Sequence, residues 1–331
     1  MNTQQRTKEW RGGFGLAVQG KLFERVRDAY DLGHLAQCRV VAIGVGGAAA
    51  FVEDLTRAGV GQLVLVDPDV VSETNVATQQ TYLRDVGRPK VDCLRDRLLD
   101  INPDAIVEVR QQALDEGFDD ATFEQLALAP LDGPKPAVVL VCGLTDNFYA
   151  QARVNRLALQ FGLPSLCAGL YSEGRCAEIT FTYPRVTPAC HRCILSSRYA
   201  AYLEQEFKND VTSHGSPIFS TTRLNALKGA IAMALLHHPT DHPRWGALLQ
   251  RIGNRNLVQI RMDPDLATTL GFTVFDRVFG PGDRERILMD EAVWLPQEPE
   301  GDCPECHGTG DLCNAIGAFT DTRLMPQKGN V

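Results

Sequence analysis

The chain has 331 residues, of which 44% are hydrophobic, and a formal net charge of -8. This length can bury a substantial core in one large α/β domain or two small ones. The acidic balance argues against a general binder of nucleic acid or of anionic membranes. Because no secretory signal or membrane-length apolar run is visible, we expect a cytoplasmic protein with no membrane partner and no nucleic-acid partner.

Strand-like and helix-like patterns alternate along the first half of the chain. Residues 1–36 have apolar positions near helical spacing, which predicts an N-terminal helical extension. The alternation that follows predicts a mostly parallel, doubly wound, Rossmann-like sheet with helices on both faces. The predicted elements are strand 39–43, helix 48–58, strand 62–66, helix 90–102, strand 105–110, strand 137–142, helix 151–161 and strand 164–170.

The pattern changes after residue 174. Alternating polar and apolar residues over 175–183 predict added antiparallel strands. Residues 184–220 are rich in proline, serine and polar residues, which predicts a long crossing loop, and 224–236 read as a largely buried helix. Further on, the apolar runs 256–261 and 272–279 indicate a β hairpin and a helix.

A glycine-rich turn follows the first predicted strand, at Gly44, Gly46 and Gly47. Such a turn lets the backbone approach phosphates, and the N-terminus of the next helix adds N–H groups and positive potential. Alone, the motif also fits a dinucleotide enzyme in which Asp67 holds a ribose, or a tight turn that only packs a strand against a helix.

Polar side chains beyond those of a dinucleotide site follow this turn. Because the carboxyl ends of parallel strands converge on one crevice, we expect these side chains to lie together. One carboxylate can take ribose hydroxyls, another can hold Mg²⁺, and a lysine can neutralise phosphate charge. A dehydrogenase needs none of these charges near a pyrophosphate. The side chains are Asp67, Asp69, Asn75, Gln79, Lys90 and Asp146.

The order of these motifs resembles the adenylation domain of the ThiF/MoeB/ubiquitin-activating-enzyme family over residues 36–195, and more weakly over 196–236. The resemblance implies adenylation of a protein's C-terminal carboxylate by ATP and Mg²⁺, with release of pyrophosphate. It also implies a small ubiquitin-like or sulfur-carrier partner ending in Gly-Gly, and a homodimer. The matching motifs are Gly44-x-Gly46-Gly47, Asp67-x-Asp69-x-Val71, Asn75, Gln79, Gly87-Arg88-Pro89-Lys90, Asn102-Pro103 and Thr145-Asp146-Asn147.

The same resemblance implies roles for single residues. Asp67 would bind the ribose and Asp146 would coordinate Mg²⁺. Catalysis of this kind is mostly alignment and charge stabilisation. The implied catalytic residues are Lys90, Asp146, Asn75 and Gln79, of which Asn75, Gln79 and Lys90 would contact the phosphates. The implied nucleotide-binding set is Gly44, Gly46, Gly47, Asp67, Asp69, Asn75, Gln79 and Lys90.

One position departs from the family pattern. Where the family has Asn-Leu-x-Arg-Gln, this chain reads Asn75-Val76-Ala77-Thr78-Gln79, and threonine supplies neither the charge nor the forked donors of arginine. Either ATP turnover is weaker or altered, or another cation substitutes. The candidates are Arg84, Arg88, and Arg6 or Arg11 of the N-terminal segment, including that segment of a partner subunit.

Two Cys-x-x-Cys pairs stand out among the ten cysteines. Cys190 with Cys193 and Cys303 with Cys306 can supply four thiolates, the usual closed tetrahedral set of a structural Zn²⁺ site. Such a site would clip the C-terminal region onto the crossing loop. A redox pair or unrelated thiols are the alternatives.

Many members of the family carry a thioester-forming or persulfide-forming cysteine in the crossing loop, but residues 194–230 contain none. The sequence therefore favours adenylation alone, with Cys176 and Cys313 as fallback nucleophiles.

The alternative functions are a peptide-modifying adenylating enzyme of the microcin-maturation type, a catalytically weak binding subunit of the same fold and, as an outside option, a nicotinamide dehydrogenase. The predicted regions are 1–36, an N-terminal helical extension; 37–185, an ATP-binding adenylation domain; and 186–331, a crossover loop, a buried helix and a C-terminal region clipped by the four-cysteine zinc site.

Overall fold

The computed structural model describes residues 21–115, 117–204, 215–263, 291–306 and 308. Its described strands form one mixed sheet in the order β3-β2-β1-β4-β5-β6-β7-β8. Strands β1 to β5 pair in parallel, and β5 to β8 pair antiparallel, which confirms the predicted mostly parallel sheet with added antiparallel strands. The strands are β1 (Arg39–Ile43), β2 (Gln62–Val66), β3 (Ile106–Arg110), β4 (Val139–Gly143), β5 (Ser165–Tyr171), β6 (Cys176–Thr182), β7 (Leu257–Arg261) and β8 (Glu291–Leu295).

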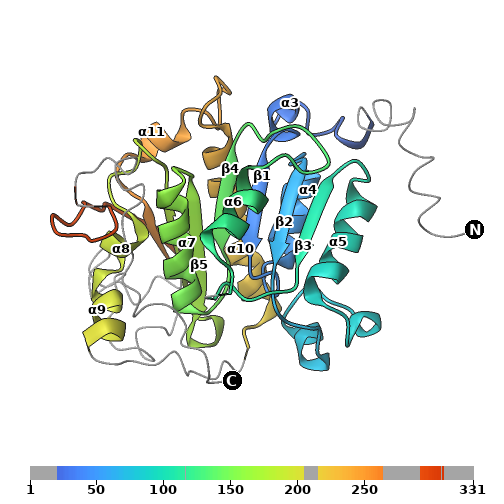
Figure 1. Ribbon diagram of the computed structural model, residues 1–331, viewed down its shortest axis with the longest axis horizontal. Coiled ribbons are helices and arrows are strands. Elements are labelled where there is room, and N and C mark those ends of the chain that lie inside the picture. Colours follow the sequence, from blue (N-terminus) through green and yellow to red (C-terminus); the bar gives the residue numbers. More distant parts are fainter. Residues whose placement is uncertain (1–20, 116, 205–214, 264–290, 307, 309–331) are drawn as a thin grey trace, which may run out of the picture.

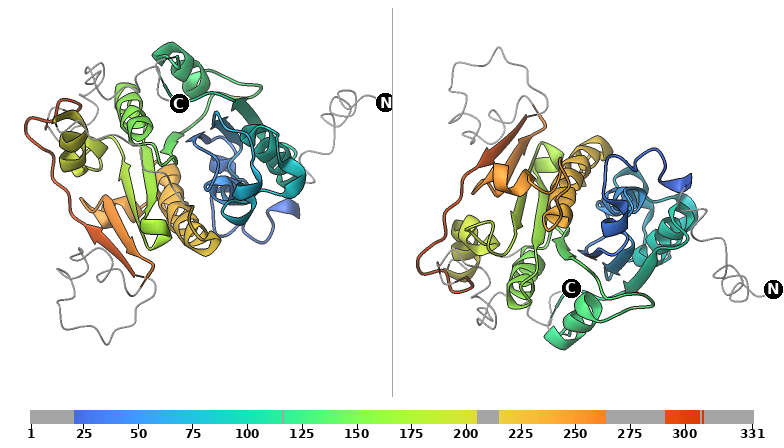
Figure 2. Two further views of the ribbon diagram at one scale, coloured as in Figure 1. Left: turned by 90° about the horizontal axis from the view of Figure 1, so that it is seen from below. Right: turned by 90° about the horizontal axis from the view of Figure 1, so that it is seen from above.

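Helices cover both faces of this sheet, as Figures 1 and 2 show. None of those in the described residues is long and apolar enough to cross a membrane. The α-helices are α3 (Leu32–Leu35), α4 (Ala49–Arg57), α5 (Lys90–Ile101), α6 (Asp120–Leu128), α7 (Phe148–Gln160), α8 (His191–Ile194), α9 (Ser196–Glu204), α10 (Ile218–His237) and α11 (Leu248–Ile252). The 3-10 helices are η1 (Glu73–Ala77), η2 (Leu83–Asp85) and η3 (Ser172–Gly174).

Alternate residues of the central strands separate two hydrophobic cores. Val40 and Leu63 belong to a core shared with α4, α5 and α10, whereas Val41 and Val64 belong to a core shared with α6 and α7. Side chains alternate between the two faces of a strand, so a strand covered on both faces is apolar throughout. The runs that predicted β1 and β2 from sequence are apolar for this reason.

One buried charge ties the sheet to α6. The Arg39 side chain is fully buried at the start of β1 and donates hydrogen bonds to Gln62 Oε1 and to the carbonyl oxygens of Leu126, Ala127 and Ala129. These carbonyls lie at the C-terminal end of α6, where unpaired carbonyls and the helix dipole favour a cation. Burial lowers the pKa of Arg39.

Several elements differ from the sequence prediction. The segment predicted as a crossing loop, 184–220, contains α8 and α9, and α10 starts within it at Ile218. The sequence interpretation did not include α6, α11 or β8. The described part of 1–36 contains α3 and turns, and the helix expected at 272–279 lies outside the described residues.

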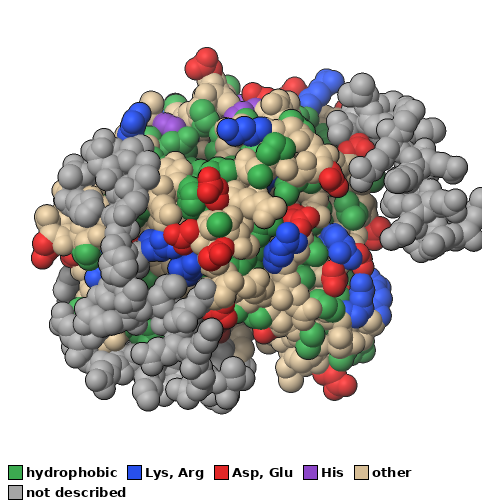
Figure 3. All heavy atoms as spheres, in the orientation of Figure 1, with side chains coloured by type: hydrophobic (Ala, Val, Ile, Leu, Met, Phe, Trp, Pro, Cys, Tyr) green, Lys and Arg blue, Asp and Glu red, His purple; other side chains and the backbone are tan. Residues whose placement is uncertain are grey.

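The order in which the chain adds strands to the sheet reverses between β1 and β4. From β1 the chain winds to β2 and β3 on one side, and β4 and β5 lie on the other side. Ligands of doubly wound sheets bind at the carboxyl ends of the strands at this kind of switch point. On the face seen in Figure 3, acidic and basic side chains of the described residues are interspersed rather than separated.

Candidate active site

A pocket of about 590 Å³ lies at the carboxyl edge of β1, β2, β4 and β5. Each residue that the sequence analysis assigned to the nucleotide site lines it, and so do residues of α10 that the analysis did not single out. The residues from the earlier prediction are Gly44, Gly46, Gly47, Asp67, Asp69, Asn75, Gln79, Lys90 and Asp146. Those added from the segment before α10 and from α10 itself are Gly215, Ser216, Thr221, Leu224, Asn225 and Lys228.

The glycine turn is closely enclosed, and this explains its composition. Gly44 has a φ of +87°, and a Cβ there would lie 3.0 Å from the Thr145 backbone nitrogen. A Cβ on Gly46 would lie 2.9 Å from Gln79 Oε1. Glycine accepts the positive φ and leaves room for both neighbours. The turn between β1 and α4 therefore packs directly against the loop after β4 and against Gln79.

Asp67 follows β2 directly and is only 5% exposed. Its Oδ2 accepts a hydrogen bond from the Val45 backbone N–H at 2.7 Å, and its Oδ1 accepts one from the Asp69 N–H at 2.9 Å. Burial raises the pKa of Asp67, and the two hydrogen bonds and Lys90 act against that rise. The carboxylate is fixed in place, and each oxygen keeps acceptor capacity for a ligand hydroxyl.

Lys90 begins α5, and its side chain is 9% exposed. Its Nζ donates to Asp69 Oδ2 at 2.7 Å, and the Asp69 side chain is itself 60% exposed. The backbone supports this arrangement, because the Lys90 N–H donates to the Asp69 carbonyl at 3.0 Å. An ammonium group is thus held at the pocket wall by a carboxylate that remains accessible to solvent.

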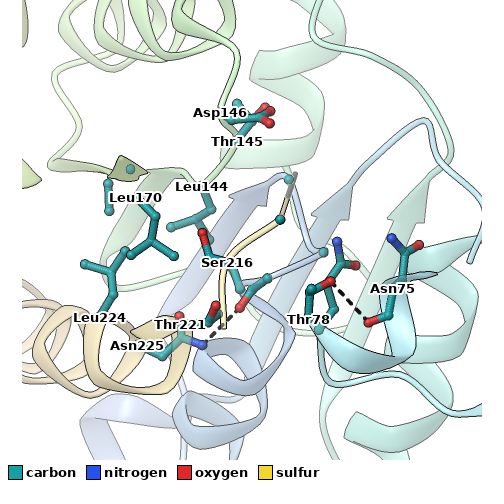
Figure 4. A pocket seen from close by; sticks show the side chains of 18 of the residues that line it. Asn75, Thr78, Leu144, Thr145, Asp146, Leu170, Ser216, Thr221, Leu224 and Asn225 are labelled. Atoms are coloured by element: carbon teal, nitrogen blue, oxygen red, sulfur yellow. Dashed lines mark hydrogen bonds between the residues drawn. The ribbon is translucent and has the colours of Figure 1, made fainter. Parts of the chain in front are cut away.

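The segment around η1 supplies amides and a hydroxyl. Asn75 Oδ1 accepts from the Ser72 N–H at 3.0 Å, which anchors η1. Gln79 Oε1 is buried and has no hydrogen-bond partner among the described residues. Thr78, which stands where the family pattern has arginine, lines the pocket beside Asn75 (Figure 4). A Cβ on Gly215 would lie 3.0 Å from Thr78 Cγ2.

Two of the cations proposed to replace the missing arginine lie elsewhere. Arg88 forms ion pairs with Asp85 and Asp96, and the Arg84 guanidinium stacks over the Tyr82 ring at 4.5 Å. Neither lines the pocket. Arg6 and Arg11 lie outside the described residues. Among the described residues that line the pocket, the basic ones are Lys90 and Lys228.

Asp146 lies in the loop after β4, at the opposite end of the pocket from α10 in Figure 4. Its side chain is exposed. Asn147 rather than Asp146 caps α7, because Asn147 Oδ1 accepts from the Ala150 N–H at 3.1 Å. The capping role that would offer a purely structural reason for Asp146 is therefore filled by its neighbour.

The four cysteines of the two Cys-x-x-Cys pairs meet although they lie far apart in sequence. Their sulfur atoms all lie within 4.8 Å of one another, and all four residues are buried. Cys190 Sγ is 3.8 Å from the sulfurs of Cys193 and Cys303, and Cys193 Sγ is 3.3 Å from that of Cys306. Four thiolates around Zn²⁺ with bonds of about 2.3 Å would be about 3.8 Å apart. The donor set therefore fits zinc.

A polar network surrounds this cluster. Glu305 is buried, accepts from Asn155 Nδ2 and forms an ion pair with Arg192 at 3.4 Å. The Asn155 Oδ1 atom accepts from the His191 N–H at 3.1 Å. His191 Nδ1 lies 2.7 Å from Thr180 Oγ1, so His191 is held by β6 rather than by the sulfurs.

Of the two fallback nucleophiles, Cys176 alone lies within the described residues, and its surroundings disfavour that role. Cys176 lies in β6, and burial raises the pKa of its thiol, which disfavours the reactive thiolate. Cys313 lies outside the described residues.

The fold and the pocket define a doubly wound α/β protein with a site of acidic and basic side chains at the switch point of its sheet. The chain belongs to the ThiF family, whose family model matches residues 21–269. This confirms the resemblance drawn from the sequence motifs.

Three comparisons show which known proteins the chain is similar to. A tRNA threonylcarbamoyladenosine dehydratase of Bacillus subtilis is 40% identical over 110 residues, which are 33% of this chain and 42% of that protein. A molybdopterin-synthase adenylyltransferase of Salmonella typhimurium is 34% identical over 163 residues, 48% of this chain and 59% of that protein. The chain thus spans about half the length of these curated relatives.

The third comparison is with a solved structure. The microcin C7 biosynthetic enzyme MccB in complex with N-formylated MccA is similar with a TM-score of 0.53 and 18% identity, covering 70% of this chain and 63% of that one. At this identity the likeness extends to the fold alone.

Proposed function

We propose that this protein adenylates the C-terminal carboxylate of a small ubiquitin-like or sulfur-carrier protein ending in Gly-Gly, using ATP and Mg²⁺. A carboxylate oxygen attacks the α-phosphorus of ATP and forms a new P–O bond. The bond between that phosphorus and the oxygen bridging to the β-phosphorus breaks, and its electron pair leaves with pyrophosphate. The products are an acyl adenylate and pyrophosphate.

One observation carries this proposal. Lys90 and the exposed carboxylate of Asp146 line the same pocket as the glycine turn at the start of α4. A triphosphate needs donors, a cation and a metal-binding carboxylate within its own length, and this pocket offers all three. Membership of the ThiF family supports the same reaction.

The proposed roles follow the chemistry of each group. Asp67 would accept hydrogen bonds from the ribose hydroxyls, since its backbone partners leave acceptor capacity on both oxygens. Lys90, oriented by Asp69, would neutralise charge that develops on the phosphates, and the side chains of Asn75 and Gln79 would donate to phosphate oxygens.

Two metals belong to the proposal. Asp146 would hold Mg²⁺, which offsets phosphate charge when bound. Cys190, Cys193, Cys303 and Cys306 would hold a structural Zn²⁺ that joins the C-terminal region to α8 and its N-cap residue.

The proposal extends to the organisation of the protein. Residues 37–185 would form the adenylation domain, with 1–36 as an N-terminal extension and 186–331 as the zinc-clipped region. Family membership supports a homodimer, and the dependence on ATP supports a cytoplasmic location.

The proposal is tested by isotope exchange between pyrophosphate and ATP in the presence of a carrier protein ending in Gly-Gly. Wild type is expected to exchange label between pyrophosphate and ATP. The exchange rate of Asp146→Ala should be lower by a factor of at least about 100. Asp100→Ala, at an exposed position on α5, is the matched control and should exchange normally. A carrier lacking its last glycine is the acceptor control. No exchange by wild type with any carrier would favour the weak binding subunit instead.

A further inference from the structure

The helix α10 presents a polar stripe to the pocket. Thr221, Asn225 and Lys228 lie at positions i, i+4 and i+7, so they share one face of the helix. All three are buried and line the pocket. The rest of the buried surface of α10 is mainly apolar, as expected for a helix that packs into the core. The stripe therefore needs an explanation other than packing.

Asn225 joins this stripe to the start of α4. Its Nδ2 donates to the Gly47 carbonyl at 3.0 Å, a contact drawn in Figure 4. Its Oδ1 is buried and has no partner among the described residues. One turn further along α10, Lys228 is only 3% exposed, and its Nζ lies 5.0 Å from the centre of the Phe51 ring on α4. The ammonium group is thus held beside the first turn of α4.

The start of α4 carries the positive potential of a helix N-terminus and is not capped by a side chain. Its N-cap residue, Ala48, makes no side-chain hydrogen bond, and its first turn has no acidic residue. The exposed N–H groups of a helix N-terminus attract anions and repel cations. Placing a buried lysine beside them is unfavourable unless an anion lies between the two.

No described carboxylate fills this position between Lys228 and the helix, since the nearby Asp67 is bonded to the Val45 and Asp69 N–H groups. Lys90 has its ion pair with Asp69, but no carboxylate within the described ranges forms an ion pair with Lys228. Burial accordingly lowers the pKa of Lys228 to about 7. A buried amine that lacks a counter-charge is costly, and an anionic ligand offsets that cost.

We propose that Lys228 binds a phosphate group of the nucleotide at the N-terminus of α4, as a second cation besides Lys90. It supplies positive charge that Thr78 cannot supply. Lys228 then belongs to the binding machinery for the phosphates rather than to the core. This inference rests on the proposed function, because it assumes that the pocket takes ATP.

The test compares ligands with and without phosphates. Lys228→Met keeps the length and apolar stem of lysine and removes its charge. Its affinity for α,β-methylene ATP is expected to fall roughly 10- to 100-fold, as for a lost hydrogen bond between charged groups. Its affinity for adenosine should stay within about twofold. Lys135→Met, at an exposed position, is the control and should leave both affinities unchanged.

The melting temperature separates this role from a structural one. Ligand-free Lys228→Met should melt no lower than wild type, because it removes a charge that is costly to bury. Unchanged affinity for the ATP analogue, or an equal loss for ATP analogue and adenosine, would overturn the inference. If Lys228→Met does not fold, Lys228→Gln takes its place in the same comparison. A wild type that binds the analogue but never exchanges pyrophosphate would refute the proposed function and leave this inference standing.

Discussion

Lys90 Nζ donates to Asp69 Oδ2 across 2.7 Å, and this contact couples the first residue of α5 to the loop after β2. The lysine is buried, whereas the carboxylate side chain is 60% exposed. A buried cation with an exposed partner can exchange that partner for a ligand anion at little cost. The pair therefore fixes the position of Lys90 at the pocket wall in the ligand-free protein.

Replacing Lys90 by methionine is expected to lower the rate of ATP–pyrophosphate exchange about 100-fold, because the charge that stabilises the phosphates is lost. The exchange rate of Asp69→Asn should fall by no more than about 10-fold, since an amide oxygen can still accept a hydrogen bond from Lys90. Steady-state exchange rates at saturating ATP measure both. A Lys90→Met rate within threefold of wild type would remove Lys90 from the proposed site.

Removal of the cysteine cluster should release a metal and loosen the C-terminal region. Wild type is expected to carry one zinc per chain, and Cys303→Ser with Cys306→Ser to carry almost none. The melting temperature should fall by about 10 °C. Cys176→Ser, outside the cluster, is the control and should keep its zinc. The assignment fails if the double variant still binds one zinc per chain, as measured by atomic emission.

His237 contributes to the pH dependence of the protein's stability. Its Nδ1 donates to the Met233 carbonyl at 2.8 Å, and its Nε2 accepts from the Asp31 N–H at 3.1 Å. Only the neutral ring can do both, and burial lowers its pKa. As pH falls below about 6.5, the unfolded chain binds a proton first, so the free energy of unfolding decreases.

Urea denaturation at several pH values tests this coupling. Wild type should lose stability between about pH 6.5 and the lower folded-state pKa. His237→Leu should show a shallower dependence over that range, whatever its absolute stability. An identical slope in the two proteins would show that His237 does not contribute to the effect.

Arg39 offers a test of the fold. Arg39→Leu would leave three carbonyls of the α6 terminus and Gln62 Oε1 without their buried donor. We expect a loss of about 3 kcal/mol in the free energy of unfolding. Arg57→Leu, where the side chain is 58% exposed, should change it by less than about 0.5 kcal/mol. Equal effects from the two substitutions would contradict this account of Arg39.

Local pattern was enough to predict the centre of the fold. The apolar runs of β1 and β2, the glycine turn at Gly44 and the paired cysteines each carry their signal within a few residues. The sequence interpretation missed β8, which pairs with β7 from across a long separation in sequence. It also missed α8, a short helix that contains Cys193 of the cluster.

Lys228 illustrates the limit of sequence-based prediction at the candidate site. The apolar pattern of 224–236 correctly indicated a buried helix, but an apolar average conceals a single charged residue. The available signal was the presence of lysine inside a helix predicted to be buried, because unpaired lysines are almost never fully buried. Its position beside α4 depends on how α10 packs, and the sequence pattern does not specify that.

A crystal structure of the protein with α,β-methylene ATP and Mg²⁺ tests the central claim most directly. The account predicts a triphosphate over the N-terminus of α4, with Lys90 Nζ within hydrogen-bond distance of a phosphate oxygen and the Asp146 carboxylate facing the metal. A nucleotide bound elsewhere, or Lys90 and Asp146 turned away from the glycine-lined pocket, would contradict it.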